Sequence, residues 1–145
     1  MRRAIAREQG TTLVEVLAAV ALIGIAFLTI LGGMMTAAVG ADVHRKAATA
    51  DLQVRSYAEA IRRASYVDCA TTSSYTPAAV GYAAPAGFSA SVTDVDYWRA
   101  SHADPDTGSW SNACPTDQGA QRVTVSLSAD DGRAATSREV VKGRP

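Results

Sequence analysis

Residues 7–33 read REQGTTLVEVLAAVALIGIAFLTILGG, and this stretch has one feature that ordinary membrane spans avoid. From Leu13 to Val39 the only charged side chain is Glu15. About 27 helical residues at about 1.5 Å each extend about 40 Å, which is enough to cross a hydrocarbon core of about 30 Å. The stretch therefore predicts a membrane-spanning helix with a single carboxylate near its start.

The charges on either side of this helix predict its orientation. Three arginines lie within the first seven residues, and three basic residues, His44–Lys46, follow the apolar run. By the positive-inside tendency the arginines hold the N-terminus in the cytoplasm, so that everything after Val39 is sent outward. The sequence thus predicts a single-pass protein of the cell membrane with an extracytoplasmic head.

The chain as a whole is small and electrically balanced. Its 145 residues and 15.1 kDa leave room for one domain of modest core outside the apolar run. There are 14 Lys and Arg against 14 Asp and Glu, and the only basic cluster of note is at the extreme N-terminus. Nucleic acid is therefore not expected as a partner, whereas membrane lipid is.

The residues before the helix have a distinctive order. A short charged leader ends in Gly10, Thr11 follows, and Glu15 is the fifth residue after the glycine. This order resembles the class III signal of the type IV pilin superfamily, which includes pilins, minor pilins and the pseudopilins of type II secretion. The resemblance implies that a prepilin peptidase cuts between Gly10 and Thr11. It also implies N-methylation of Thr11, although the family usually has Phe at that place.

Glu15 calls for a physical explanation. A carboxylate costs about 2.5–3.5 kcal/mol at the centre of a bilayer and less near an interface. In the first turn of a helix the macrodipole favours an anion by about 0.3–1 kcal/mol. In the resembled family the remaining partner is the N-terminal amine of a neighbouring subunit, so the resemblance implies that Glu15 sets axial register during filament assembly. The alternative is a glutamate that only extends to the membrane surface.

Three glycines interrupt the apolar run at Gly24, Gly32 and Gly33. Each lowers helix propensity by about 1 kcal/mol relative to Ala and leaves the backbone accessible. Two interpretations stay open. One is close packing of small residues against neighbouring helices. The other is the local loss of helicity that the resembled family shows about twenty residues beyond its cleavage site in assembled pili.

Beyond Gly40 the composition becomes polar but the helical periodicity persists. An apolar stripe recurs at steps of four and three residues, at Val43, Ala47, Ala50, Val54, Tyr57 and Ile61. We expect an amphipathic helix over residues 41–66 that continues the span and presents its stripe to a sheet. A free coiled coil is the competing interpretation, but the stripe is short and rich in alanine.

The C-terminal half predicts strands. Residues 71–91 are rich in Ser, Thr, Pro, Gly and Ala and predict a surface connection with at most one short strand. Residues 91–100 and 121–129 alternate apolar and polar side chains, and the second run places Val123, Val125 and Leu127 on one face. An Asp-Asp-Gly turn at 130–132 then joins 121–129 to a last strand, which gives a C-terminal antiparallel hairpin. This hairpin is similar to that of minor pilins and I-type pseudopilins.

Together these segments predict an α+β fold in which a long N-terminal helix, membrane span plus amphipathic half, packs on a small antiparallel sheet. The expected organisation is a leader at 1–10, a transmembrane and assembly helix at 11–40, an amphipathic helix at 41–66 and a β-rich head at 67–145.

The chain has two cysteines, Cys69 and Cys114, and both lie in the part predicted to be exported. An even count in an oxidising compartment predicts one disulfide, which would close a long loop and stabilise a small head by about 2–4 kcal/mol. The alternative is two free buried thiols.

No residue pattern predicts catalysis, a cofactor or a metal. The two histidines, His44 and His102, lie in no nucleophile or metal motif and are expected at the surface. Asp104 and Asp106 have the first spacing of a calcium loop but lack its remainder, so an ordinary turn is the favoured interpretation. We expect that the protein is not an enzyme.

Three aromatic residues lie near this turn: Tyr97, Trp98 and Trp110. An adhesive surface is one interpretation, but aromatic side chains bury large areas, so core packing of at least two of them is the expectation.

The most consistent interpretation is a minor pilin-like or pseudopilin-like subunit, processed at Gly10 and inserted into a surface filament, with prepilin peptidase, other subunits and a membrane assembly platform as partners. Two alternatives remain. One is a secreted protein whose conventional signal peptide is cut after Gly40, within the small-residue stretch 38–42. The other is an uncut, membrane-anchored binding protein. The residues do not distinguish a pilus from a secretion or DNA-uptake system.

Overall fold

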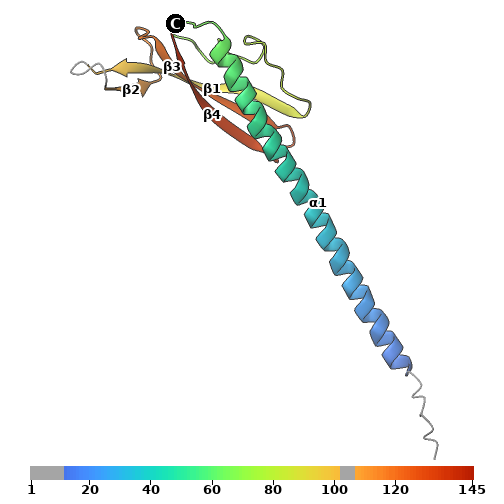
Figure 1. The fold of residues 1–145 in the computed structure, drawn as a ribbon. Coiled ribbons are helices and arrows are strands. Elements are labelled where there is room, and N and C mark those ends of the chain that lie inside the picture. Colours follow the sequence, from blue (N-terminus) through green and yellow to red (C-terminus); the bar gives the residue numbers. More distant parts are fainter. Residues whose placement is uncertain (1–11, 102–106) are drawn as a thin grey trace, which may run out of the picture. The chain divides into compact units, whose positions relative to one another are not determined.

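The computed structural model describes residues 12–101 and 107–145. Within these residues there are one helix, α1 (Leu13–Arg63), and four strands, β1 (Phe88–Ala100), β2 (Gly108–Ser111), β3 (Ala120–Ala129) and β4 (Ala135–Gly143) (Figure 1). The chain divides into two compact units, of which the first ends at Ala41 and the second is Asp42–Pro145.

The described part of the first unit is helical from Leu13 onward, and its large apolar side chains are exposed. The most apolar 18-residue window has a mean hydropathy of 2.6 and is 0% buried. This helix is therefore long and apolar enough to cross a membrane, as the composition predicts.

The glycines of this unit do not interrupt the helix. The helix is unbroken at Gly32 and Gly33, and a Cβ placed on either would meet nothing within 4 Å. Within a single chain these glycines therefore neither break the helix nor allow a close contact with another segment. Packing against other helices and local unwinding on assembly both stay predictions.

In the second unit α1 packs on one face of the sheet through five buried residues, Ala50, Val54, Tyr57, Ala58 and Ile61. The predicted stripe is confirmed from Ala50 onward. It is wrong at Ala47, which is exposed, while Val43 is half-buried. Near Ala47 and Val43 the helix is held by ion pairs instead, because Lys46 bonds to both Asp42 and Asp131. Asp131 belongs to the turn between β3 and β4.

The helix ends at Arg63, three residues before the predicted boundary, and Lys142 of β4 explains its end. The Lys142 ammonium donates to the carbonyl oxygens of Ile61 at 2.9 Å and Arg62 at 3.3 Å, and also to that of Ala64. These carbonyls lack helical partners, and the negative end of the helix dipole favours a cation there. Burial lowers the pKa of Lys142, which is only 5% exposed.

The four strands form one antiparallel sheet in the order β2-β1-β3-β4, which confirms the predicted α+β class. β3 and β4 form the predicted hairpin, and Gly132 adopts φ 71° in its turn, a conformation that favours glycine. Two details differ from expectation. β1 begins at Phe88 instead of residue 91, because its first residues pair with the end of β3, and the short β2 was not predicted.

The core lies between α1 and the sheet. Val123, Val125 and Leu127 are 0% exposed and share one face of β3, as the alternation predicts. The segment after α1 adds the buried side chain of Tyr75. Its hydroxyl donates a hydrogen bond to the side-chain oxygen of Gln121 at 3.3 Å. Each fully buried Val or Leu side chain of this core contributes about 1.5–3 kcal/mol to the stability of the fold, relative to leaving it exposed.

Candidate functional site

The first candidate site is the start of α1. Thr12 precedes the helix, and the backbone N–H of Glu15 donates to the Thr12 carbonyl at 2.9 Å and to its hydroxyl oxygen at 3.4 Å. Thr-x-x-Glu at a helix start is a capping-box pattern, so Thr12 satisfies a backbone donor that the helix leaves unpaired. This cap was not predicted, although Thr12 and Glu15 have the spacing of the capping-box pattern. Glu15 lies in the first turn and is exposed.

The predicted cleavage and methylation positions, Gly10 and Thr11, lie outside the described residues. The structure describes the helix that follows them. Its exposed side chains include Leu13 at 78%, Phe27 at 60% and Met35 at 75%. Soluble monomers rarely expose so long a run of apolar side chains, which is compatible with a helix that could cross a membrane.

The second candidate site is at the far end of α1, where a disulfide joins Cys69 to Cys114. The predicted pairing is confirmed: the two Cα atoms are 5.6 Å apart and the residues are 45 positions apart in sequence. The bond ties the segment after α1 to the segment between β2 and β3. Cys69 has φ 48°, an uncommon backbone angle for a residue other than glycine.

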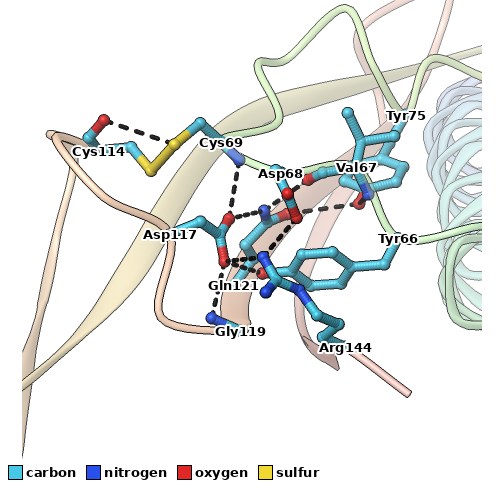
Figure 2. A network of polar contacts seen from close by, with 10 residues as sticks. All are labelled: Tyr66, Val67, Asp68, Cys69, Tyr75, Cys114, Asp117, Gly119, Gln121 and Arg144. Carbon is cyan, nitrogen blue, oxygen red and sulfur yellow. Dashed lines mark hydrogen bonds and ion pairs between the residues drawn. A yellow bond between two sulfur atoms is a disulfide. The ribbon is translucent and has the colours of Figure 1, made fainter.

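Beside the disulfide, Asp117 organises the surrounding backbone (Figure 2). Its side chain is 6% exposed. The carboxylate accepts hydrogen bonds from five donors: the Cys69 N–H at 2.8 Å, the Tyr66 hydroxyl at 2.8 Å, the Gly119 N–H at 2.7 Å, the Gln121 amide at 2.9 Å and the Arg144 guanidinium at 3.5 Å. No local pattern in the sequence indicates this role, because most of these partners are distant along the chain.

Gln121 extends the network into the core. It is 0% exposed, and its amide donates to the Val67 carbonyl at 2.7 Å as well as to Asp117. The Tyr75 hydroxyl donates to its oxygen and accepts from the Val67 N–H at 3.1 Å. Backbone N–H and C=O groups of a segment without regular structure therefore find hydrogen-bond partners in Asp117, Gln121 and Tyr75. These bonds hold the end of α1 against the sheet.

The electrostatics of Asp117 follow from these contacts. Burial by itself opposes the charged form, but the hydrogen bonds from Cys69, Tyr66, Gln121 and Gly119 outweigh it and lower the pKa of Asp117 to about 2. Because the ordinary value is 3.8, the folded state holds the carboxylate charged more strongly than the unfolded chain does.

Acidification should therefore destabilise the head through Asp117. The contribution is complete above about pH 5 and is lost as the pH falls through the ordinary pKa toward 2, a loss of about 2 kcal/mol. We expect Asp117→Asn to be less stable than wild type at neutral pH, and the difference to shrink on acidification. Urea unfolding of the full chain in detergent measures both.

The matched control is Asp68→Asn. Asp68 pairs with Arg144 at 2.6 Å, but both side chains are exposed, and such surface pairs contribute about 0–1 kcal/mol. A difference between wild type and Asp117→Asn that stayed constant from neutral pH to about pH 2 would contradict the assignment.

Metal binding has little support among the described residues. Cys69, Cys114 and Asp117 present ligand atoms within 4.8 Å of one another. The two sulfur atoms are bonded to each other, however, and the carboxylate already accepts from five hydrogen-bond donors. His44 is exposed as expected, whereas His102, Asp104 and Asp106 lie outside the described residues.

The expectation that at least two of the three aromatic residues pack in the core was wrong, because one of them does. Tyr97 is in the core, 7% exposed, and its hydroxyl donates to the Ala70 carbonyl at 2.6 Å. Trp98 and Trp110 are half-buried and contact each other edge to face with ring centroids 5.3 Å apart. They lie on neighbouring strands as Cα partners, on the sheet face away from the core.

A hollow of about 570 Å³ lies at the end of α1, lined by small or apolar side chains together with Arg63 and Tyr75. Among its lining residues there is no acid and base pair and no activated nucleophile of the kind that catalysis needs. Comparisons of the chain with protein-family models, curated proteins and solved structures gave no match.

Proposed function

We propose that the chain is the precursor of a minor pilin-like or pseudopilin-like structural subunit, which a prepilin peptidase processes and which assembles into a type IV pilus or a type II secretion-type filament. The observation that carries the proposal is Glu15, the only charge between Leu13 and Val39, in the first turn of an exposed apolar helix. The protein acts as a substrate of enzymes and is not one itself.

The apolar helix supports this function because it needs two successive environments. Before assembly, lipid covers the exposed side chains, and the cytoplasmic N-terminus with its three arginines sets the orientation. In a filament, helices of other subunits replace the lipid. A carboxylate in the first turn then pairs with the amine that cleavage creates at Thr11 of a neighbour, which lowers the energy of burying both charges.

The head supports an extracytoplasmic location. Disulfides persist in oxidising compartments, and Cys69–Cys114 is such a bond. The proposed partners are accordingly prepilin peptidase, other pilin or pseudopilin subunits, a membrane assembly platform and membrane lipid.

A secreted protein is the second candidate, and one observation favours keeping it. Among the residues that the structure describes, the hydrophobic core lies within the compact unit Asp42–Pro145, so a signal peptide cut after Gly40 would leave this core in the released head. An uncut membrane anchor is the third candidate. The three differ in where the mature chain begins.

N-terminal sequencing of the protein from its own cells separates these candidates. We expect a start at Thr11, which removes three arginines and one glutamate and changes the formal net charge from 0 to −2, with 11 basic against 13 acidic residues. A start at Ala41 would instead establish a secreted protein, and an intact Met1 an uncut anchor. As a control, a bulky replacement at Gly10 should block processing.

A further inference from the structure

The disulfide between Cys69 and Cys114 lies at the edge of the core. Both cysteines are half-buried and pack against the core from outside it. A bond in this position is open to thiol–disulfide exchange with small thiols in solution. The attacking group in that reaction is the negatively charged thiolate and not the neutral thiol. The charges around the two sulfur atoms therefore influence how fast the bond is reduced.

A fixed carboxylate lies beside both sulfur atoms. One carboxylate oxygen of Asp117 and the two Sγ atoms all lie within 4.8 Å of one another. The carboxylate is held in this place because its side chain is only 6% exposed and accepts the five hydrogen bonds described above (Figure 2). With a pKa of about 2, Asp117 is charged at every pH at which thiolates form.

The neighbouring cations do not remove this charge from the disulfide. Arg144 donates to Oδ1 of Asp117 at 3.5 Å, whereas the Cys69 N–H bonds to the other oxygen, Oδ2. Arg144 also pairs with Asp68 at 2.6 Å, so one guanidinium is shared by two carboxylates. Arg99 donates at 3.1 Å to the carbonyl of the residue before the second cysteine. Two cations and two carboxylates thus surround the bond, and Asp117 is the carboxylate placed beside both sulfur atoms.

We propose that Asp117 protects the disulfide against reduction by anionic thiols. In the reduction, a thiolate of the reductant attacks one Sγ, the S–S bond breaks, and the other cysteine leaves as a thiolate. A second reductant thiolate attacks the mixed disulfide, releases the first cysteine and forms the disulfide of the reductant. Two electrons pass from the two reductant thiols to the protein, and the cysteine thiolates take up protons from water.

The carboxylate opposes this reaction in two ways. It repels the incoming thiolate, and it disfavours the negative charge that develops on the departing sulfur atom. The repulsion is strongest for a reductant with a further negative group and weakest for one with an ammonium group beside its sulfur. In water, one unit charge about 4.8 Å from another changes a rate by about three- to fourfold.

The test compares two small thiols, cysteamine, which carries an ammonium group, and 2-mercaptoethanesulfonate, which carries a sulfonate. The full chain is kept in an uncharged detergent, and alkylation with mass spectrometry follows the reduction. Each rate is divided by the thiolate concentration. The charge ratio is the cysteamine rate divided by the sulfonate rate. The same chain unfolded in urea gives the reference ratio, because unfolding removes Asp117 from the sulfur atoms. We expect the folded wild type to exceed the reference at least about threefold.

Variants separate the charge of Asp117 from general effects on folding. Arg144→Gln removes a cation and keeps the carboxylate, so it should raise the charge ratio, whereas a looser fold would lower it toward the reference. Asp117→Asn should bring the ratio close to the reference while the head stays folded. Asp51→Asn is the matched control. Asp51 is exposed, pairs with Arg55 at 2.8 Å and lies about 18 Å of helix before Arg63, so its ratio should equal that of wild type.

Three results would overturn the proposal. A charge ratio of the folded wild type equal to the reference would show that the bond is reduced only after the chain opens. A lower ratio in Arg144→Gln would show that structure and not charge sets the rate. An unchanged ratio in folded Asp117→Asn would assign the selectivity to other groups. If Asp117→Asn does not fold, the wild type and Arg144→Gln decide. Neither cleavage nor filament assembly is assumed, so the test stands apart from the proposed function.

Discussion

Replacing Glu15 with alanine is expected to leave membrane insertion and cleavage intact and to reduce incorporation into filaments at least about tenfold, which corresponds to about 1.4 kcal/mol per subunit. The reason is that the proposed filament would bury the exposed apolar helix in its interior. The amine of a processed neighbour would be buried there without its counter-charge, and breaking a buried pair is strongly unfavourable. The measurement is the amount of this subunit in sheared filaments divided by the amount in membranes.

Two further variants identify what Glu15 contributes. Glu15→Gln keeps the shape and removes the charge, so it should behave nearly like alanine if the charge matters. Thr12→Ala removes the hydroxyl that accepts from the Glu15 N–H, and this should lower helix stability by about 0.5–2 kcal/mol without affecting incorporation. If Thr12→Ala reproduced the loss, Glu15 would act through the helix cap instead.

Glu59→Ala is the matched control on the same helix. Glu59 is exposed and pairs with Arg62 at 2.8 Å, and an exposed pair of this kind contributes little. The ratio of filament to membrane protein should equal that of wild type. An unchanged ratio for Glu15→Ala would falsify the pairing role and leave Glu15 as a residue that caps the helix at the membrane surface.

Removal of the disulfide is the other large expected effect. We expect the double variant Cys69→Ser with Cys114→Ser to lose about 3 kcal/mol of unfolding free energy, because the bond closes a loop of 45 residues in the unfolded chain. The Cys69 N–H also donates to Asp117, so release of the segment weakens the Asp117 network as well. Urea unfolding in detergent measures the loss, and cleavage at Gly10 should be unaffected.

Chemical reduction of the wild type provides an independent comparison, since it should give the same loss without a substitution. Thr72→Ala with Thr116→Ala alters exposed residues near the two cysteines and should unfold like wild type. Equal stabilities for the oxidised wild type and the double cysteine variant would show that the bond does not hold the head together.

Much of the fold could be predicted because it rests on interactions between residues close in sequence. The apolar run, the stripe from Ala50 to Ile61 and the alternation in Val123–Leu127 are periodic patterns, and each period specifies the local structure that buries it. The turn at Gly132 likewise follows from a dipeptide. With two cysteines in the chain, a single pairing was available for Cys69 and Cys114. Sequence therefore determined the α+β class, the hairpin and the disulfide, and it proposed Glu15 as a functional residue.

The tertiary structure alone decided how the end of α1 is held and where the tryptophans lie. Lys142 bonds to Ile61 across 81 positions of sequence, and Asp117 bonds to Cys69 across 48. At least two of Tyr97, Trp98 and Trp110 were expected in the core, but the register of β1 with β2 and β3 places Trp98 beside Trp110 on the sheet face away from it. Such contacts follow from how distant strands pair and which backbone groups are left without partners, and no pattern within a few residues encodes either.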